Sequence, residues 1–130
     1  MRFLVMVKPN KDEVARYERG SFPENFGDTL ENMGAFNQTL IDDGMLVDMG
    51  GLTPTSKGVR IDYSGGKPQI TDGPFTETKE LITGFWLLEA PSKKELVERL
   101  SHCPFPYGES IEIRPLFSNE DLEPYLKKDA

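Results

Sequence analysis

The sequence predicts an α+β domain, and three kinds of pattern carry this prediction. Short segments that alternate or are apolar throughout are typical of strands, two segments with apolar residues at helical spacing are typical of helices, and glycine pairs mark turns. These segments follow one another as strand, helix, strand, hairpin, strand, helix, strand. That order is the βαββαβ plan of a ferredoxin-like fold with an inserted β-hairpin.

Size and charge limit the classes of function. The chain has 130 residues, 37% hydrophobic and 28% charged, which suits one globular domain. Its formal net charge of −7 disfavours a nucleic-acid or anionic-membrane surface, because both need basic patches. We find no run of about 20 apolar residues and no signal peptide. We therefore expect a cytoplasmic protein, and the single cysteine, Cys103, agrees with a reducing compartment.

The first part of the chain supplies a central strand and the longest helix. Residues 2–8 predict a strand covered on both faces, because odd and even positions alike are apolar. Residues 11–27 are typical of a loop with about one helical turn. A helix follows over residues 28–43, with Asp28 and Glu31 as a capping box and a glycine after its end. Its expected inward residues are Leu30, Met33, Phe36, Leu40 and Ile41.

The middle of the chain predicts a short strand and a hairpin. Residues 45–49 form the strand, and Gly50-Gly51 is expected to open a turn after it. Residues 58–63 alternate, and residues 68–71 return after Ser64-Gly65-Gly66-Lys67. Paired glycines accept the positive φ angles of a type I′ turn, so this segment predicts a β-hairpin.

The last part of the chain predicts a strand, a helix, a strand and a tail. Residues 83–90 predict a second strand that is apolar on both faces, and a capping box opened by Ser92 starts a short helix. Residues 110–116 alternate as a strand does. Residues 119–128 predict a short helical tail, whose length Pro124 limits.

Two strands that are apolar on both faces need cover on both faces. Two helices can cover only one face of a four-stranded sheet. Burying about 1,000 Å² of apolar surface is worth on the order of 25 kcal/mol before entropy costs. A second copy of the same sheet would hide the other face in an isologous homodimer with C2 symmetry. The alternative cover is the C-terminal segment together with the inserted hairpin.

Four motifs carry a family resemblance. Residues 72–80 read DGPFTETKE, residues 44–58 read GMLVDMGGLTPTSKG, residues 84–89 read GFWLLE and residues 111–115 read IEIRP. The chain thereby resembles the DGPF branch of the YciI-like, or YCII-related, proteins over residues 1–116, with residues 117–130 as a C-terminal tail. The resemblance implies a ferredoxin-like α+β fold that forms a dimeric α+β barrel with the sheets facing each other.

Histidine usage departs from that family. Many YciI-like proteins carry a histidine paired with an aspartate, proposed as an acid/base dyad. This chain has one histidine, His102, which lies in the second predicted helix rather than in the first half of the fold. The histidine of the dyad is therefore not carried over, and the enzymatic interpretation is weaker. Near a helix C-terminus, His102 is favoured as a cation, and it is a candidate for ligand binding.

Asp72 is the candidate catalytic residue. A carboxylate beside Gly73 and Pro74 could act as a general base if burial raised its pKa. The structural alternative is that Asp72 accepts backbone N–H bonds in a turn. Phe75 and Lys79 follow in the same motif and are candidates for ligand binding, although a lysine in such a loop is more often solvated.

Glu112 and Arg114 are the remaining ligand-binding candidates. They lie two positions apart on one strand and project from the same face, opposite Ile111 and Ile113. Charges on a covered face must pair or bind something, and Arg114 would bind a carboxylate or phosphate. The alternatives are an ion pair across the dimer interface or an edge strand in water.

We predict no cofactor and no metal. One histidine and one cysteine do not make an ordinary zinc site, and neither a Walker A motif nor GxGxxG occurs. Two functions follow: a dimeric module that binds a small molecule or regulates, and a cofactor-independent enzyme with Asp72 as acid or base. The first is favoured because no complete catalytic set can be assembled. A module that binds a partner protein through its acidic surface is a third, weaker option.

Overall fold

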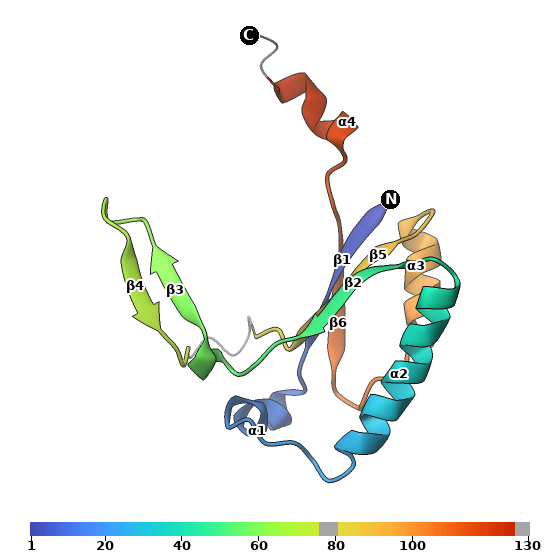
Figure 1. Ribbon diagram of the computed structural model, residues 1–130, viewed down its shortest axis with the longest axis horizontal. Helices are drawn as coiled ribbons and strands as arrows, with labels where there is room; N and C mark the ends of the chain where they lie inside the picture. Colours follow the sequence, from blue (N-terminus) through green and yellow to red (C-terminus); the bar gives the residue numbers. More distant parts are fainter. Residues whose placement is uncertain (76–80, 127–130) are drawn as a thin grey trace.

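The computed structural model describes residues 1–75 and 81–126, and its body is a four-stranded sheet with helices on one face (Figure 1). The strand order is β2-β5-β1-β6, and all neighbouring strands are antiparallel. The strands are β1 (Arg2–Lys8), β2 (Leu46–Gly51), β5 (Gly84–Glu89) and β6 (Ser110–Pro115). This mixed α+β arrangement is consistent with the predicted ferredoxin-like plan.

The core lies between this sheet and the two helices α2 (Phe26–Asp42) and α3 (Lys93–Leu100) (Figure 1). In register, Phe3 pairs with Leu88, and the side chains of both are fully buried. The buried cluster comprises Phe3, Val5, Leu40, Trp86, Leu88, Ala90, Leu96 and Leu100. Apolar residues at alternate positions of two neighbouring strands thus meet the inward stripe of each helix.

The opposite face of the sheet, which we call the open face, is also apolar. Leu4 pairs with Leu87 and Met6 with Phe85, and all four side chains are half-buried. Figure 1 shows α2 and α3 on the other side of the sheet only. The prediction that these two strands carry apolar side chains on both faces is therefore confirmed.

Helix α2 begins earlier than predicted. It starts at Phe26 after Asn25, so the predicted capping box of Asp28 and Glu31 is wrong. The predicted glycine after the helix is confirmed, since Gly44 has a φ of +69°. Leu30 and Ile41 are exposed, contrary to prediction. They lie roughly 80° and 100° round the helix from the buried Leu40, off the face that packs on the sheet.

The glycine pair at positions 50 and 51 lies within a strand rather than in a turn. Gly50 and Gly51 end β2 and pair with Phe85 and Gly84 of β5. A Cβ on Gly50 would lie 2.9 Å from Cε1 of Phe85, so the glycine leaves room for that ring. The close approach of a neighbouring side chain, and not a turn, explains this glycine.

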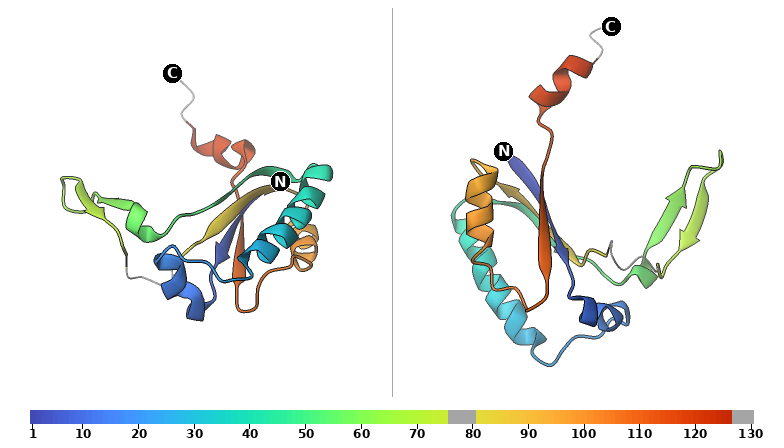
Figure 2. Two further views of the ribbon diagram at one scale, coloured as in Figure 1. Left: turned by 60° about the horizontal axis from the view of Figure 1, so that its bottom comes forward. Right: turned by 180° about the vertical axis from the view of Figure 1, so that it is seen from behind.

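The inserted hairpin consists of β3 (Val59–Asp62) and β4 (Gln69–Asp72), which form a separate two-stranded sheet. Its predicted type I′ turn is wrong, because Gly66 has a positive φ of +89° and Gly65 does not. Asp72 is the last residue of β4 rather than part of a loop. Figure 1 and Figure 2 show the hairpin projecting on the side of the sheet opposite α2 and α3.

The C-terminal segment forms the short helix α4 (Asn119–Leu122) and a 3₁₀ turn over Glu123–Tyr125. Ser118 and Asp121 form a capping box at its start. Figure 2 shows this segment and the hairpin leading away from the sheet. The alternative in which these two segments cover the open face is therefore wrong for the described residues. Within residues 1–75 and 81–126, no helix has the length and apolar character needed to cross a bilayer.

Candidate ligand-binding site

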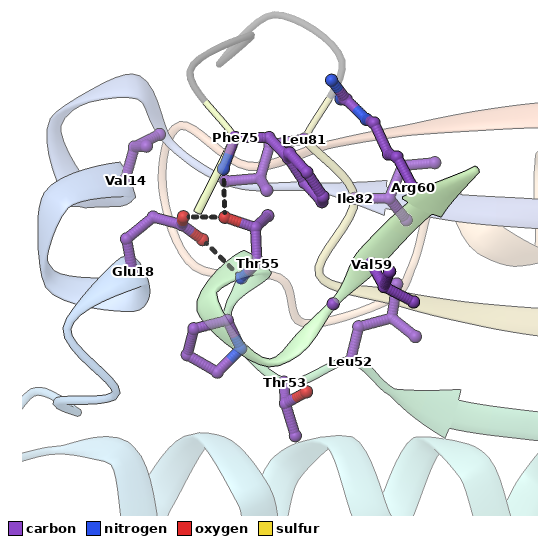
Figure 3. A pocket seen from close by; sticks show the side chains of 12 residues that line it. Val14, Glu18, Leu52, Thr53, Thr55, Val59, Arg60, Phe75, Leu81 and Ile82 are labelled. Atoms are coloured by element: carbon purple, nitrogen blue, oxygen red, sulfur yellow. Dashed lines mark hydrogen bonds between the residues drawn. The ribbon is translucent and has the colours of Figure 1, made fainter. Parts of the chain in front are cut away.

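A cavity of about 360 Å³ lies between the hairpin base and helix α1 (Val14–Glu18). Val14 and Glu18 of α1 form one wall, and residues 52–55 and 58–60 form a second (Figure 3). Phe75, Leu81 and Ile82 close the remaining side. Most of these side chains are apolar, as is usual for a small-molecule site.

A chain of hydrogen bonds joins the three walls at Thr55, which belongs to a 3₁₀ turn over Thr55–Lys57 (Figure 3). The Glu18 carboxylate accepts from the backbone N–H of Thr55 at 3.1 Å and from its hydroxyl. The hydroxyl oxygen of Thr55 accepts from the backbone N–H of Phe75 at 3.1 Å. One threonine therefore fixes both α1 and the DGPF segment (residues 72–75) to the cavity wall.

The DGPF segment lies very close to that turn. A Cβ on Gly73 would lie 1.8 Å from the carbonyl oxygen of Thr55, so no residue with a side chain fits at this position. The N–H of Gly73 donates to the carbonyl of Gly58 at 3.0 Å. The glycine of the motif thus allows close backbone approach.

An aromatic ring and a cation form the rim of the cavity. The guanidinium of Arg60 lies 4.0 Å from the centroid of the Phe75 ring, a cation–π contact (Figure 3). Phe75, a predicted ligand-binding residue, therefore lines the cavity.

Tyr17 holds the cavity wall in place through its hydroxyl group. Its hydroxyl donates to the carbonyl oxygen of Leu52 at 2.7 Å and also lies 2.9 Å from that of Thr53. Burial raises the pKa of Tyr17, and the negative charge of Glu18 raises it further. The phenol is therefore a stable donor at neutral pH and holds residues 52 and 53 in place.

The other predicted site residues lie elsewhere. Asp72 is exposed at the end of β4, does not line the cavity, and makes no side-chain hydrogen bond or ion pair within the described residues. His102 is exposed two residues after the end of α3. Lys79 lies outside the described residues. The candidates predicted from the sequence therefore do not converge on one point.

Glu112 and Arg114 lie on the open face, as predicted. In the register of β1 and β6, Glu112 pairs with Met6 and Arg114 with Leu4, on the face opposite the helices. The carboxylate of Glu112 forms an ion pair with Lys8 of the neighbouring strand at 3.0 Å. Both Glu112 and Arg114 are exposed in a single chain.

Glu18, Thr55, Arg60 and Tyr17 are the site residues that sequence reasoning missed. Glu18 and Thr55 are 37 positions apart, and no motif or periodicity connects them. Glu18 belongs to the predicted helical turn within residues 11–27, which is confirmed by α1. Its polar surroundings in the sequence gave no sign that this turn packs against the DGPF segment.

The fold and the cavity define an α+β domain with a small-molecule-sized pocket beside its inserted hairpin. The chain belongs to the YCII-related domain family, which it matches over residues 1–119. An uncharacterised protein of Rhizobium meliloti (strain 1021) is 32% identical over 90 residues, covering 67% of this chain and 72% of that protein.

A solved enzyme structure aligns with most of the chain. It is 5-chloro-2-hydroxyhydroquinone dehydrochlorinase (TftG) from Burkholderia phenoliruptrix AC1100, in complex with 2,5-dihydroxybenzoquinone. The TM-score is 0.44 and the sequence identity 16%, covering 93% of this chain and 99% of that one.

Proposed function

We propose that the protein is a homodimeric module that binds a small molecule in the cavity between α1 and the DGPF segment. The supporting observation is the cavity itself, which has a volume of about 360 Å³ and mostly apolar walls. The hydrogen bonds of Glu18 and Phe75 to Thr55 hold these walls together. A pocket that is largely apolar and has a few fixed polar groups is the usual form of a small-molecule site.

The dimer is supported by the open face. Leu4, Met6, Phe85 and Leu87 lie side by side on it, and no described segment of the same chain covers them. A contiguous, partly exposed apolar patch of this kind is typical of an interaction surface. A second copy seated there would bury it, with the charged pair Lys8–Glu112 at its edge.

Binding is tested by NMR with a general fragment library, following the amide signals of residues lining the cavity. We expect fragments to shift signals of Thr53, Thr55 and Phe75. A Val59→Trp variant, which places an indole in the cavity wall, should abolish these shifts. The matched control is Gln69→Trp on the opposite face of the same hairpin, where neither Gln69 nor its cross-strand partner Asp62 lines the cavity and binding should persist. Fragment shifts that survive Val59→Trp, or that map elsewhere, would contradict the proposed site.

The dimer is tested by light scattering at micromolar concentrations. One chain has a mass of 14.7 kDa, and we expect twice this value. A Leu87→Asp variant, which puts a charge in the middle of the open face, should return the mass of one chain while keeping the fold. A wild-type protein with the mass of one chain at these concentrations would exclude the dimer.

A catalytic role for Asp72 is the second candidate. Its carboxylate is exposed at the hairpin base and accessible to a substrate, outside the cavity itself. Here Asp72 would act as general acid or base in a cofactor-independent reaction. The test is an Asp72→Asn variant assayed on any substrate found by screening. Loss of turnover with an unchanged melting temperature is the expected result, and unchanged turnover would exclude this role.

A further inference from the structure

The β3–β4 hairpin is an arm with two different faces. In register, Ile61 pairs with Ile70 and Val59 with Asp72, so these four side chains share one face. The other face carries Arg60, Asp62, Gln69 and Thr71. Val59, Ile61 and Ile70 are 55%, 47% and 70% exposed, so the first face presents three large apolar side chains to water.

Such an arm is not stable by itself. A two-stranded hairpin without a third strand or a packed helix is marginal in water. An exposed apolar patch is also a site at which other chains associate. Apart from its base at Val59, which lines the cavity, this face has no cover among the described residues of the same chain, since Figure 1 and Figure 2 show the arm projecting from the body.

The base of the arm fixes its direction. The bond from Gly73 to Gly58 closes its two strands at 3.0 Å, and the bond from Phe75 to Thr55 ties the end of β4 to the cavity wall at 3.1 Å. With both strands anchored at the base, the arm projects away from the body (Figure 2). Its apolar face is therefore available to another molecule.

We infer that the apolar face of the arm packs on a second copy of this chain and clasps the dimer. This inference rests on the proposed dimer. The arm projects on the side of the sheet that carries the open face, so a copy seated on that face lies beside the arm (Figure 2). The two apolar surfaces are thus parts of one interface.

The charges on the arm and on the open face also favour a second copy of this chain as the partner. The arm face carries one acid, Asp72, and the open face carries Arg114, and neither makes an ion pair within the described residues. In a C2 dimer every such complementary pair occurs twice. A second copy therefore offers the apolar surface and the opposite charge that the arm lacks. The arm also carries Val59 and Arg60 of the cavity wall, so the clasp would hold one side of the ligand site in place.

The test is sedimentation equilibrium of full-length variants. Ile70→Asp changes the apolar face, and Thr71→Asp places the same charge one residue along the strand on the other face. We expect Ile70→Asp to raise the dimer Kd by about tenfold or more, as for a central interface residue, and Thr71→Asp by less than about twofold. Equal Kd values for the two variants would overturn the clasp.

Two further variants separate the possible causes of failure. Ile70→Thr keeps a β-branched side chain suited to a strand, so an effect on Kd from this variant cannot come from loss of the hairpin. A raised Kd for Ile70→Thr confirms the clasp, and an unchanged Kd overturns it. If wild type is a monomer, the proposed dimer fails and the clasp fails with it. If wild type is a dimer that Leu87→Asp dissociates but Ile70→Asp does not, only the clasp fails.

Discussion

The backbone N–H of Phe75 donates to the hydroxyl oxygen of Thr55 at 3.1 Å, and this bond fixes the DGPF segment to the cavity wall. The same hydroxyl donates to Glu18, so Thr55 is both a donor and an acceptor. No other described side chain bonds to two of the three cavity walls in this way. The position of the ligand site therefore depends on a residue that lies 17 positions before the motif, which begins at residue 72.

Replacing Thr55 with valine should loosen the DGPF segment. Valine has a similar shape but no hydroxyl, so the part-buried N–H of Phe75 loses its acceptor. We expect a loss of about 1–2 kcal/mol of unfolding free energy, seen as a lower midpoint in urea. Thr55→Ser keeps the hydroxyl and is the control. A valine variant as stable as the serine variant would show that the bond contributes nothing.

A side chain at position 73 should not be tolerated. The Cβ of Gly73→Ala would meet the carbonyl oxygen of Thr55 at 1.8 Å, so the backbone must shift. We expect a destabilisation of about 1–3 kcal/mol, the usual cost of overpacking, and a change in the Phe75 amide signal in NMR. Gly65→Ala in the same hairpin meets nothing within 4 Å and should leave both unchanged. A normal Phe75 signal in Gly73→Ala would contradict this account.

The hydrogen bond between Trp86 and Asn37 should contribute to the stability of the core. Its side chain is 4% exposed, and its indole N–H donates to the side-chain oxygen of Asn37 at 3.0 Å. Asn37→Leu leaves that donor without its acceptor, which should cost about 1–3 kcal/mol in thermal or urea unfolding. In a Trp86→Phe background the donor is gone, so the same Asn37→Leu change should cost much less. An equal loss of unfolding free energy in the two backgrounds would show that the hydrogen bond contributes nothing to stability.

Local periodicity predicted the sheet well. The bounds of β1 are those predicted, and the two-faced character of β1 and β5 follows from apolar residues at both odd and even positions. The Ser92 cap of α3 is confirmed by its bond to the N–H of Glu95 at 3.2 Å. These features depend on neighbours within a few residues, and that range is the one a sequence pattern describes.

The cavity could not be predicted, because it depends on contacts between distant segments. Glu18, Thr55 and Phe75 meet only after the hairpin base has packed against α1. The predicted turn at Gly50 is wrong for the same reason, since the ring that requires a glycine there belongs to Phe85, 35 positions later in the chain. Only Phe75 was included among the candidates, through the family motif and not through any spacing.

The thiol of Cys103 should react slowly in the folded protein. Burial, together with the nearby negative charge of Glu109, raises its pKa to about 12. The thiolate, which is the reactive form, is therefore scarce at pH 8. We expect reaction with the disulfide reagent DTNB to be more than about tenfold slower in native buffer than in denaturant. Equal rates in the two conditions would show that the folded protein neither shields the Cys103 thiol nor lowers its reactivity.

Glu109 should make stability fall as pH rises. Burial raises its pKa above the ordinary value of 4.5, so the folded state keeps this proton at a pH where the unfolded state has lost it. Between 4.5 and the raised folded pKa, the folded state binds more protons, and its stability decreases with pH. Glu109→Gln has no such proton to lose. Its unfolding free energy minus that of wild type should therefore grow across this window and level off above it. Urea unfolding in steps from about pH 4 to pH 8 measures the difference, and a constant difference would exclude a raised pKa.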